Sequence, residues 1–291
     1  MERTSIENCH NYASLSVTSK STGCFGGVAG YASSEIPLIG CSNHGELSLT
    51  DYNNNLDTHA IGGIVGHASG TIQDCLNTGA INVYSAKKCF IYGIGSSTAV
   101  NCINTGMLKF RSSYRTDTQV YGIAKKATNC FNSSQIVIND NAGGIYHVKD
   151  LYAICSDSES STGNFFAGSV YAPEVNHQTL DPEGTYTVVT LTDGGVDDVT
   201  LSSLNSWVGN NSTAARSYDL WTRNEDGLPA FTWQMGDQNN DGVISISDLP
   251  SLIDLLRGVY TRHTRWSVDV NGDGLASPAD VEALTDRLLE K

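Results

Sequence analysis

The sequence predicts a mainly β fold, in which a parallel β-solenoid (β-helix) is followed by a small all-α domain. Two observations support this prediction. Short β-prone segments recur at a near-constant spacing in residues 6–155, and one acidic loop pattern occurs twice in residues 237–280. Repeats of this length are typical of solenoids, whose coils bury their apolar faces only by stacking. We therefore expect solenoid repeats in 1–155, a solenoid cap and connector in 156–235, and the all-α domain in 236–291.

Each repeat contains a cysteine, and an asparagine follows two residues later. The cysteines are spaced by 32, 34, 27 and 28 residues, at Cys9, Cys41, Cys75, Cys102 and Cys130. A glycine-rich half-unit alternates with this one, as in residues 62–66. Strands of successive coils stack about 4.8 Å apart. We expect the cysteines to point into the core and the asparagines to form a ladder at a corner, where left-handed backbone suits Asn and Gly.

The array resembles the GLUG-type repeats found in surface proteins of gut bacteria, and the resemblance covers residues 6–155. After it, a short Leu-Asn-x-Trp helix at 204–207 and a Gly-x-Pro-x-Phe strand at 227–231 resemble the closing segment that often follows such repeats. We expect this segment to cover the open end of the solenoid, because an exposed strand edge invites aggregation.

The chain has eight cysteines, an even number that suggests disulfides in a secreted protein. Five of them recur at one phase of the repeat, which stacks them one coil apart, and free cysteine is a good small core residue. We favour mostly reduced, buried thiols over disulfides. A bridge between Cys24 and Cys89 is disfavoured because these residues lie about two coils apart.

Residues 237–248 and 269–280 each match an EF-hand-type calcium loop. Asp or Asn stands at loop positions 1, 3 and 5, glycine at 6 and Asp at 12, while the carbonyl at position 7 and the serine at position 9 add further oxygen ligands. The first loop supplies Asp237, Asn239, Asp241, Val243, Ser245 and Asp248. The second supplies Asp269, Asn271, Asp273, Leu275, Ser277 and Asp280. Each loop gathers three carboxylates whose mutual repulsion a divalent cation removes. We expect two bound Ca²⁺ ions; two acidic turns without metal are the alternative.

An apolar segment of helical period follows each loop. Ser277 and Pro278 suit the N-cap and the first helical position of the second helix. Pro250 is tolerated only in a first helical turn, so the first helix is expected to start nearer Ser247 than Ser245. No amphipathic helix precedes either loop in the sequence.

These features together resemble a type I dockerin over residues 236–291. The resemblance implies a calcium-dependent docking module that binds a cohesin-like protein module, often within a polysaccharide-degrading assembly. In that family, small hydroxyl residues at loop positions 10 and 11 usually contact cohesin. Here those positions are Ile246-Ser247 and Pro278-Ala279, so Ser247 is the expected partner-binding residue.

Composition excludes several other classes of function. The net charge is −14 and the sequence holds no Lys/Arg-rich run, which argues against binding of nucleic acid or anionic membranes. No apolar run approaches the ~18 residues of a membrane span. Residues 1–5 are not a signal peptide, so we expect a fragment of a longer chain. The acidic, Gly/Asn/Ser/Thr-rich composition suits an extracellular or bacterial cell-surface protein.

The sequence contains no HExxH, Gly-x-Ser-x-Gly, phosphate-loop or CxxC motif. We therefore expect a non-catalytic protein. The alternative is a carbohydrate-active β-helix enzyme, a lyase or a glycosidase acting through paired carboxylates, or a glycan-binding adhesin. Asp51, Asp57, Asp74 and Asp117 fall at different phases of the repeat, which argues against a carboxylate pair.

Two further features bear on a glycan ligand. Lys87-Lys88 and Lys125-Lys126 could neutralise an acidic sugar, but we favour solvated loops. Tyr92 and Tyr121 share a repeat position and could begin an aromatic platform for sugar rings, but we favour a structural stack.

Overall fold

The computed structural model describes residues 5–289, except 20, 34–35, 53–57, 113–116, 141–147, 158, 173–185, 193–194, 214–217, 219, 224–225, 232–235, 237, 239–243, 260–269 and 272–274. The chain forms two compact units. The solenoid unit comprises Met1–Tyr218 and Arg223–Ala230, and the helical unit comprises Asp219–Thr222 and Phe231–Lys291.

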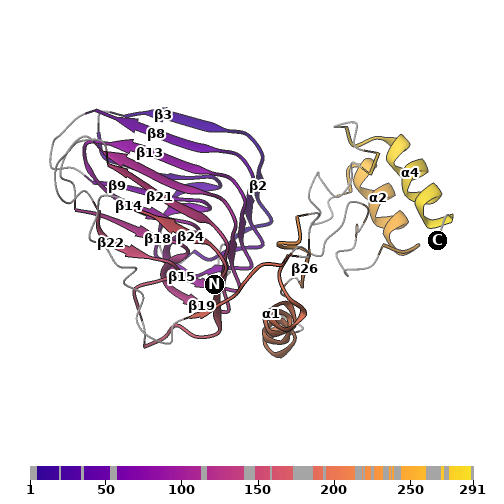
Figure 1. The fold of residues 1–291 in the computed structure, drawn as a ribbon. Helices are drawn as coiled ribbons and strands as arrows, with labels where there is room; N and C mark the ends of the chain where they lie inside the picture. The colour runs from indigo at the N-terminus through magenta and orange to yellow at the C-terminus, as the bar shows by residue number, and fades with distance from the viewer. Residues whose placement is uncertain are drawn as a thin grey trace. The chain divides into compact units, whose positions relative to one another are not determined.

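The solenoid unit is built from four sheets whose strands pair in parallel between neighbouring coils (Figure 1). The first sheet contains, in spatial order, β1 (Ile6–Glu7), β6 (Leu38–Ile39), β11 (Ile72–Gln73), β15 (Gly95–Val100), β10 (Val65–Ala68) and β5 (Ala29–Ala32), with β19 (Ala124–Thr128) paired to β15. The second contains β2 (His10–Asn11), β7 (Ser42–Asn43), β12 (Leu76–Asn77), β16 (Ile103–Asn104), β20 (Phe131–Asn132), β23 (Asn164–Phe166) and β25 (Tyr186–Val188). The third contains β24 (Ser169–Tyr171), β21 (Gln135–Asp140), β17 (Leu108–Ser112), β13 (Ile81–Ser85), β8 (Leu47–Asp51) and β3 (Leu15–Thr18). The fourth contains β22 (Val148–Tyr152), β18 (Thr118–Tyr121), β14 (Lys88–Tyr92), β9 (Thr58–Gly62) and β4 (Gly23–Gly26). The predicted parallel β-solenoid is confirmed.

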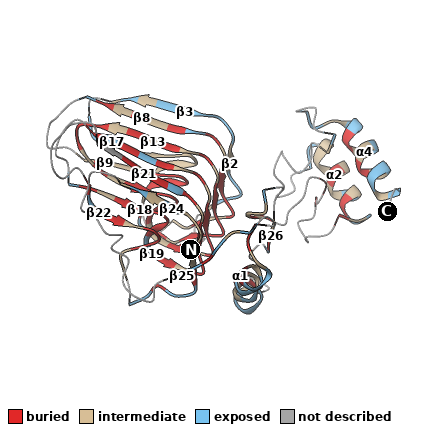
Figure 2. Cartoon of the chain, viewed as in Figure 1, coloured by how far each residue is buried: buried red, intermediate tan, exposed pale blue. Residues whose placement is uncertain are grey.

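Alternation along each strand decides which side chains enter the core (Figure 2). In β13, Ile81, Val83 and Ser85 are buried, while Asn82 and Tyr84, which alternate with them, are partly exposed. The register of strand pairing places Ile81 beside Leu47 in one neighbouring coil and beside Leu108 in the other. Like residues therefore stack from coil to coil, and buried rows of Ile, Leu and Val run along the solenoid.

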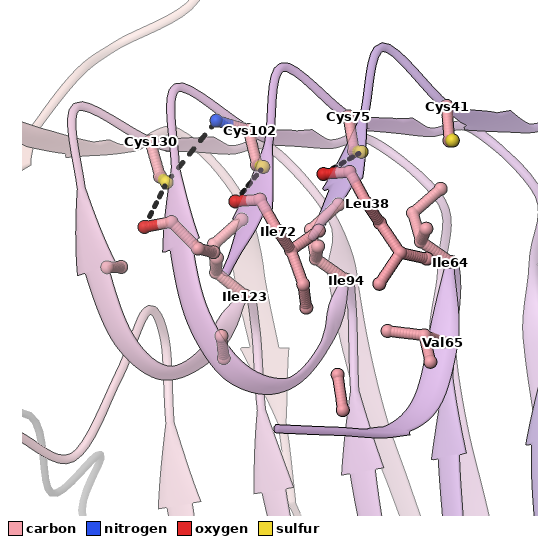
Figure 3. Packing of buried hydrophobic residues seen from close by; sticks show 14 of the residues in the cluster. Leu38, Cys41, Ile64, Val65, Ile72, Cys75, Ile94, Cys102, Ile123 and Cys130 are labelled. Atoms are coloured by element: carbon pink, nitrogen blue, oxygen red, sulfur yellow. Dashed lines mark hydrogen bonds between the residues drawn. The ribbon is translucent and has the colours of Figure 1, made fainter. Parts of the chain in front are cut away.

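The repeat cysteines form one such buried row. Figure 3 shows Cys41, Cys75, Cys102 and Cys130 stacked on successive coils, and all four are fully buried. Each Sγ donates to the carbonyl oxygen two residues earlier, at 3.2–3.4 Å. All eight cysteines lie in the described part of the chain, and all are free thiols. The prediction of mostly reduced, buried thiols is confirmed; the exceptions are Cys9, which is exposed, and Cys24, which is half-buried.

The asparagines two residues after the cysteines form the predicted ladder. Each Nδ2 donates to the Oδ1 of the next, at 2.8, 2.8, 2.8 and 3.1 Å, along Asn11, Asn43, Asn77, Asn104 and Asn132. In the buried rungs the same Nδ2 also reaches a backbone carbonyl, as from Asn77 to Gly79 at 3.0 Å. A buried amide satisfied in this way fixes the corner of each coil.

The prediction that left-handed backbone lies at the ladder asparagines was wrong. The ladder asparagines lie in strands, and the left-handed backbone falls instead on the residue before each cysteine. Those residues, with φ between 51° and 62°, are Asn8, Gly40, Asp74, Asn101 and Asn129. Asn, Asp and Gly tolerate this conformation best, and the turn they make lets the cysteine enter the core.

Parallel pairing continues past residue 155. β23 pairs with β20, β24 with β21, and β25 with β23, so part of the predicted cap and connector (156–235) extends the sheets. The helix α1 (Asp198–Asn211) follows, with Asp197 as its N-cap. The carbonyl of Leu204 in α1 accepts a hydrogen bond from Asn129 Nδ2 at 3.2 Å, and Tyr218 Oη contacts Gln73 Oε1 at 3.4 Å. The contacts of α1 and Tyr218 therefore reach residues of two different coils, whereas β23, β24 and β25 cover the last coil.

The short strands β26 (Trp221–Arg223) and β27 (Pro229–Phe231) pair with each other. The helical unit contains α2 (Asp248–Leu256) and α4 (Pro278–Leu289). Both helix starts agree with the sequence, because Ser247 is the N-cap of α2 and Pro278 opens α4. None of the described helices is long and apolar enough to cross a membrane.

Candidate functional site

The last carboxylate of each acidic loop is buried at the start of a helix. Asp248 opens α2 and Asp280 lies in the first turn of α4, and both are fully buried. Asp248 Oδ1 accepts from the backbone N–H of Gln238 at 2.6 Å and its Oδ2 from that of Ser245 at 2.7 Å. The Asp248 carboxylate therefore binds the backbone near the start of its loop and again at position 9.

The second loop repeats this arrangement. Asp280 Oδ1 accepts from the N–H of Asn271 at 3.2 Å and its Oδ2 from that of Ser277 at 2.7 Å. Ser277 Oγ in turn accepts from the N–H of Ala279 at 3.2 Å. Asp280 thus makes one half of a capping box, with Asp in place of Glu, while the Ser277 hydroxyl accepts from the N–H of Ala279 and not from that of Asp280. One carboxylate thus caps the start of the helix and holds the loop against it by hydrogen bonds.

The structure describes half of the predicted calcium ligands. Those described are Ser245, Asp248, Asn271, Leu275, Ser277 and Asp280. Those outside the described residues are Asp237, Asn239, Asp241, Val243, Asp269 and Asp273. Among the residues that are described, no three His, Cys, Asp or Glu side chains gather as a metal cluster.

The described donors nevertheless fit a hard divalent cation. They offer carboxylate, amide, hydroxyl and carbonyl oxygens, which are the ligands that Ca²⁺ takes in proteins. Asp248 and Asp280 are buried carboxylates, and a buried charge is costly unless hydrogen bonds and an opposite charge compensate it. The backbone N–H bonds supply the first of these, and a bound cation would supply the second.

The surface predicted to meet a partner lies at the same helix starts. Ile246 is 78% exposed, and Ser247, Pro278 and Ala279 are also exposed. Ser247 Oγ lies 2.6 Å from Ser245 Oγ. The four residues at loop positions 10 and 11 are therefore all accessible.

Comparison with known proteins identifies the class of this unit. Residues 235–289 match the family model of the dockerin type I domain. No curated protein and no solved structure matches the chain. The protein is therefore a parallel β-solenoid that carries a dockerin type I domain at residues 235–289. Dockerin domains of this type generally bind calcium, typically dock onto cohesin modules and are typically extracellular.

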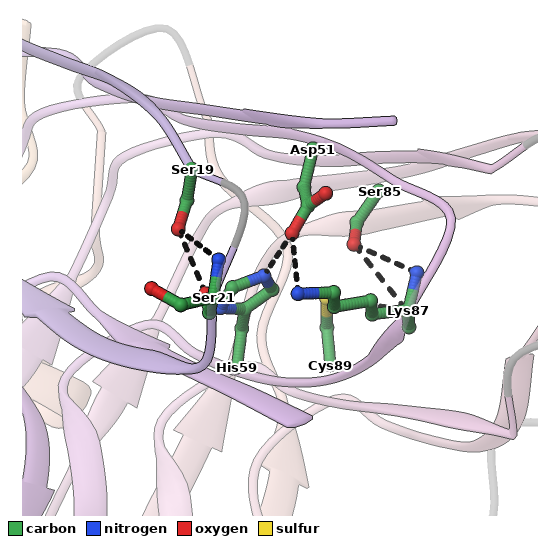
Figure 4. Close-up of polar contacts among 7 residues, drawn as sticks. All are labelled: Ser19, Ser21, Asp51, His59, Ser85, Lys87 and Cys89. Atoms are coloured by element: carbon green, nitrogen blue, oxygen red, sulfur yellow. Dashed lines mark hydrogen bonds and ion pairs between the residues drawn. The ribbon is translucent and has the colours of Figure 1, made fainter. Parts of the chain in front are cut away.

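A buried ionic cluster in the solenoid was not predicted from the sequence (Figure 4). Asp51 Oδ2 lies 2.8 Å from His59 Nε2 and 3.0 Å from Lys87 Nζ, and all three side chains are fully buried. The prediction that Lys87 lies in a solvated loop was therefore wrong. Residues 52–57 separate β8 from β9, but two residues, 86 and 87, separate β13 from β14, and this tight corner directs Lys87 inward.

The other lysines considered for an acidic sugar are more exposed. Lys88 is partly exposed, with its Nζ 4.9 Å from the centre of the Phe90 ring. Lys125 and Lys126 are exposed, as a solvated segment requires, and Lys126 Nζ pairs with Asp157 Oδ2 at 2.8 Å.

The tyrosines at one repeat position form an internal stack. The ring centres of Tyr92 and Tyr121 lie 4.9 Å apart, and those of Tyr121 and Tyr152 lie 5.0 Å apart. Tyr92 and Tyr121 are buried, and burial raises the pKa of Tyr121 to about 12. The prediction of a structural stack is confirmed.

Of the carboxylates considered for glycoside chemistry, the two described buried ones, Asp51 and Asp74, lie at different corners of the coils. Asp51 is buried beside His59, and Asp74 is buried at another corner, where it accepts a hydrogen bond from Asn101 Nδ2. Asp117 precedes β18, and Asp57 lies outside the described residues.

Proposed function

We propose that the protein is a non-catalytic extracellular or cell-surface protein whose β-solenoid is attached to a cohesin-type module through a calcium-dependent dockerin. The observation that carries this proposal is the dockerin type I match at residues 235–289. The two buried carboxylates that close the loops, Asp248 and Asp280, support it independently. The GLUG-type character of the repeats and a role in polysaccharide breakdown belong to the same proposal.

Calcium acts in this proposal as an ordering ion, one per loop. Each ion would be held by the six predicted ligands of its loop, with Asp248 or Asp280 contributing from the helix. The cation neutralises three carboxylates and fixes the loop against the helix. In each repeat the buried carboxylate therefore couples ion binding to the geometry of the helix start.

Docking would use the exposed helix starts. Of the four residues at loop positions 10 and 11, Ser247 alone carries a hydroxyl, and Ile246 beside it is a large exposed apolar residue. An apolar side chain next to a hydrogen-bonding group is a suitable anchor for a protein interface. We therefore expect the start of α2, rather than that of α4, to contact the partner.

The test is calorimetric titration of the full chain with a panel of cohesin modules, in calcium and in excess EGTA. Binding in calcium that disappears in EGTA is the expected result. Asp248→Asn should weaken calcium binding about tenfold or more, since one of three loop carboxylates loses its charge. Asp254→Asn on the same helix is the matched control. A chain that binds calcium but none of the cohesins would leave the dockerin without a docking role.

Glycan binding is a second candidate, favoured by one group on the outer face of the solenoid. Tyr52 is 72% exposed and lies 5.3 Å from Tyr84, ring centre to ring centre, while the Arg111 guanidinium lies 5.5 Å from the centre of the Tyr84 ring. Aromatic faces beside a cation suit an acidic sugar. Binding of acidic oligosaccharides that Tyr84→Ala abolishes would support this candidate, and its absence would remove it.

A further inference from the structure

The buried cluster of Asp51, His59 and Lys87 joins two successive coils of the solenoid. Asp51 is the last residue of β8, and His59 is the second residue of β9, in the same coil. Lys87 belongs to the next coil, between β13 and β14. The strand register places Asp51 beside Ser85 and His59 beside Cys89, so Lys87 reaches back from its own coil to the coil before it.

The three side chains converge on a single oxygen atom. Asp51 Oδ2 receives both His59 Nε2, at 2.8 Å, and Lys87 Nζ, at 3.0 Å (Figure 4). The exposed fraction of each side chain is zero. An amine and a carboxyl group are thus held in contact away from water. In this buried site, water cannot solvate them as separate ions.

We propose that Lys87 and Asp51 form a covalent isopeptide (amide) bond that links the two coils. In this reaction Lys87 Nζ attacks Asp51 Cγ, a C–N bond forms, and the C–Oδ2 bond breaks. The ammonium and carboxylate together hold three hydrogens on nitrogen and two oxygens on carbon. One hydrogen stays on the amide nitrogen, and the other two leave with Oδ2 as one water molecule. The condensation needs no oxidant, reductant or cofactor.

Burial makes this condensation reasonable on physical grounds. Two charges in an apolar interior are costly, and transfer of one proton from the amine to the carboxyl group gives the neutral pair that reacts. Fixing the two groups in contact removes the entropy cost of bringing them together. Once the released water has left this buried site, no water is at hand for the reverse hydrolysis.

His59 is the catalytic residue in this proposal, because its Nε2 contacts the oxygen that leaves. An imidazole at that position takes up the proton from the attacking amine and returns it to the departing oxygen. Its Nδ1 is buried and has no hydrogen-bond partner. A buried orphan nitrogen costs free energy, and apolar neighbours such as Phe25, whose ring centre lies 5.7 Å away, exclude water around it.

The first test is the intact mass of the purified full chain under denaturing conditions. The proposal expects a mass lower than the sequence mass by one water molecule, and a proteolytic peptide pair in which residues 51 and 87 are joined. A full sequence mass with no joined peptides would overturn the proposal and leave a buried ion pair with a histidine.

Substitutions separate this bond from loss of water elsewhere, such as at the Asp-Gly pairs of the sequence. Lys87→Met should restore the full mass expected for the variant, while Lys88→Met, at the neighbouring lysine, should keep the deficit. Asp51→Asn should lose ammonia instead of water. His59→Phe should accumulate the cross-linked form more slowly in a time course after refolding. A deficit that persists in Lys87→Met would overturn the proposal.

Discussion

The solenoid unit and the helical unit are stabilised by different means. In the solenoid, two buried apolar clusters pass through successive coils, so each coil is covered by its neighbours. In the helical unit, the described buried cluster of apolar residues is Ile244, Leu252 and Leu284, and the stacked pair Trp221 and Phe231 is buried outside that cluster. A core of that size seldom holds a small domain together without a metal or a disulfide. Repetition is sufficient for the first unit, whereas the second is expected to require its ions.

Removal of calcium should therefore produce the largest difference in stability between the two units. In excess EGTA we expect the helical unit to lose its helices, because uncompensated carboxylates repel and the small core cannot offset the ordering entropy. The solenoid should remain folded. Far-UV circular dichroism should show partial loss of helix, because α1 belongs to the solenoid unit, with the β signal retained. Thermal melting should show the solenoid transition unchanged. Equal loss of both signals would contradict the difference between the units.

The buried cluster offers the largest expected effect within the solenoid. Lys87→Met removes the lysine that is linked to the buried Asp51 and leaves a buried carboxyl group behind, and breaking a buried pair in this way typically costs about 3–5 kcal/mol. For a unit of this size the melting temperature should fall by roughly 10 °C. Differential scanning calorimetry should show the loss in the solenoid transition. Lys88→Met is the control, and calcium binding should be unchanged in both variants.

The architecture of both units follows from patterns that sequence alone displays. The period of Cys9 to Cys130 predicted a parallel solenoid, because stacked coils need like residues at like positions. The acidic loops predicted two helices, and Ser247 and Pro278 marked their starts correctly. Such features are local or periodic, so they can be recognised without knowledge of long-range contacts.

Features that depend on the shape of one corner were not predictable in the same way. Lys87 looks like half of a surface lysine pair, and only the two-residue connection between β13 and β14 turns it inward. The left-handed residues before each cysteine could have been found, since Asn, Asp or Gly precedes every one of the five repeat cysteines. The left-handed backbone was predicted instead at the asparagine after each cysteine, because that residue type recurs in every repeat.

The asparagine ladder should distinguish inner coils from the first coil. Asn77→Ala removes a donor to Asn104 and an acceptor from Asn43, which leaves buried groups without partners and costs about 1–3 kcal/mol. Asn11→Ala, in the half-buried first rung, should cost less because water can replace part of the lost bonds. Urea unfolding of the two variants measures the difference. Equal losses in the two variants would show that burial of the inner rungs adds nothing to the stability that the ladder provides.

The smallest expected effect concerns the alkaline limit of the solenoid. Burial raises the pKa of Cys89 to about 12, from an ordinary value of about 9. A group whose folded pKa is raised stabilises the fold fully below its unfolded pKa and loses that contribution as pH rises toward the folded pKa. The solenoid should therefore lose stability between pH 9 and 12, and Cys89→Ala should reduce that loss. Melting temperatures of the two proteins across this window provide the measurement. Because several buried thiols and tyrosines contribute in the same direction, the Cys89 variant should flatten the curve without abolishing its slope.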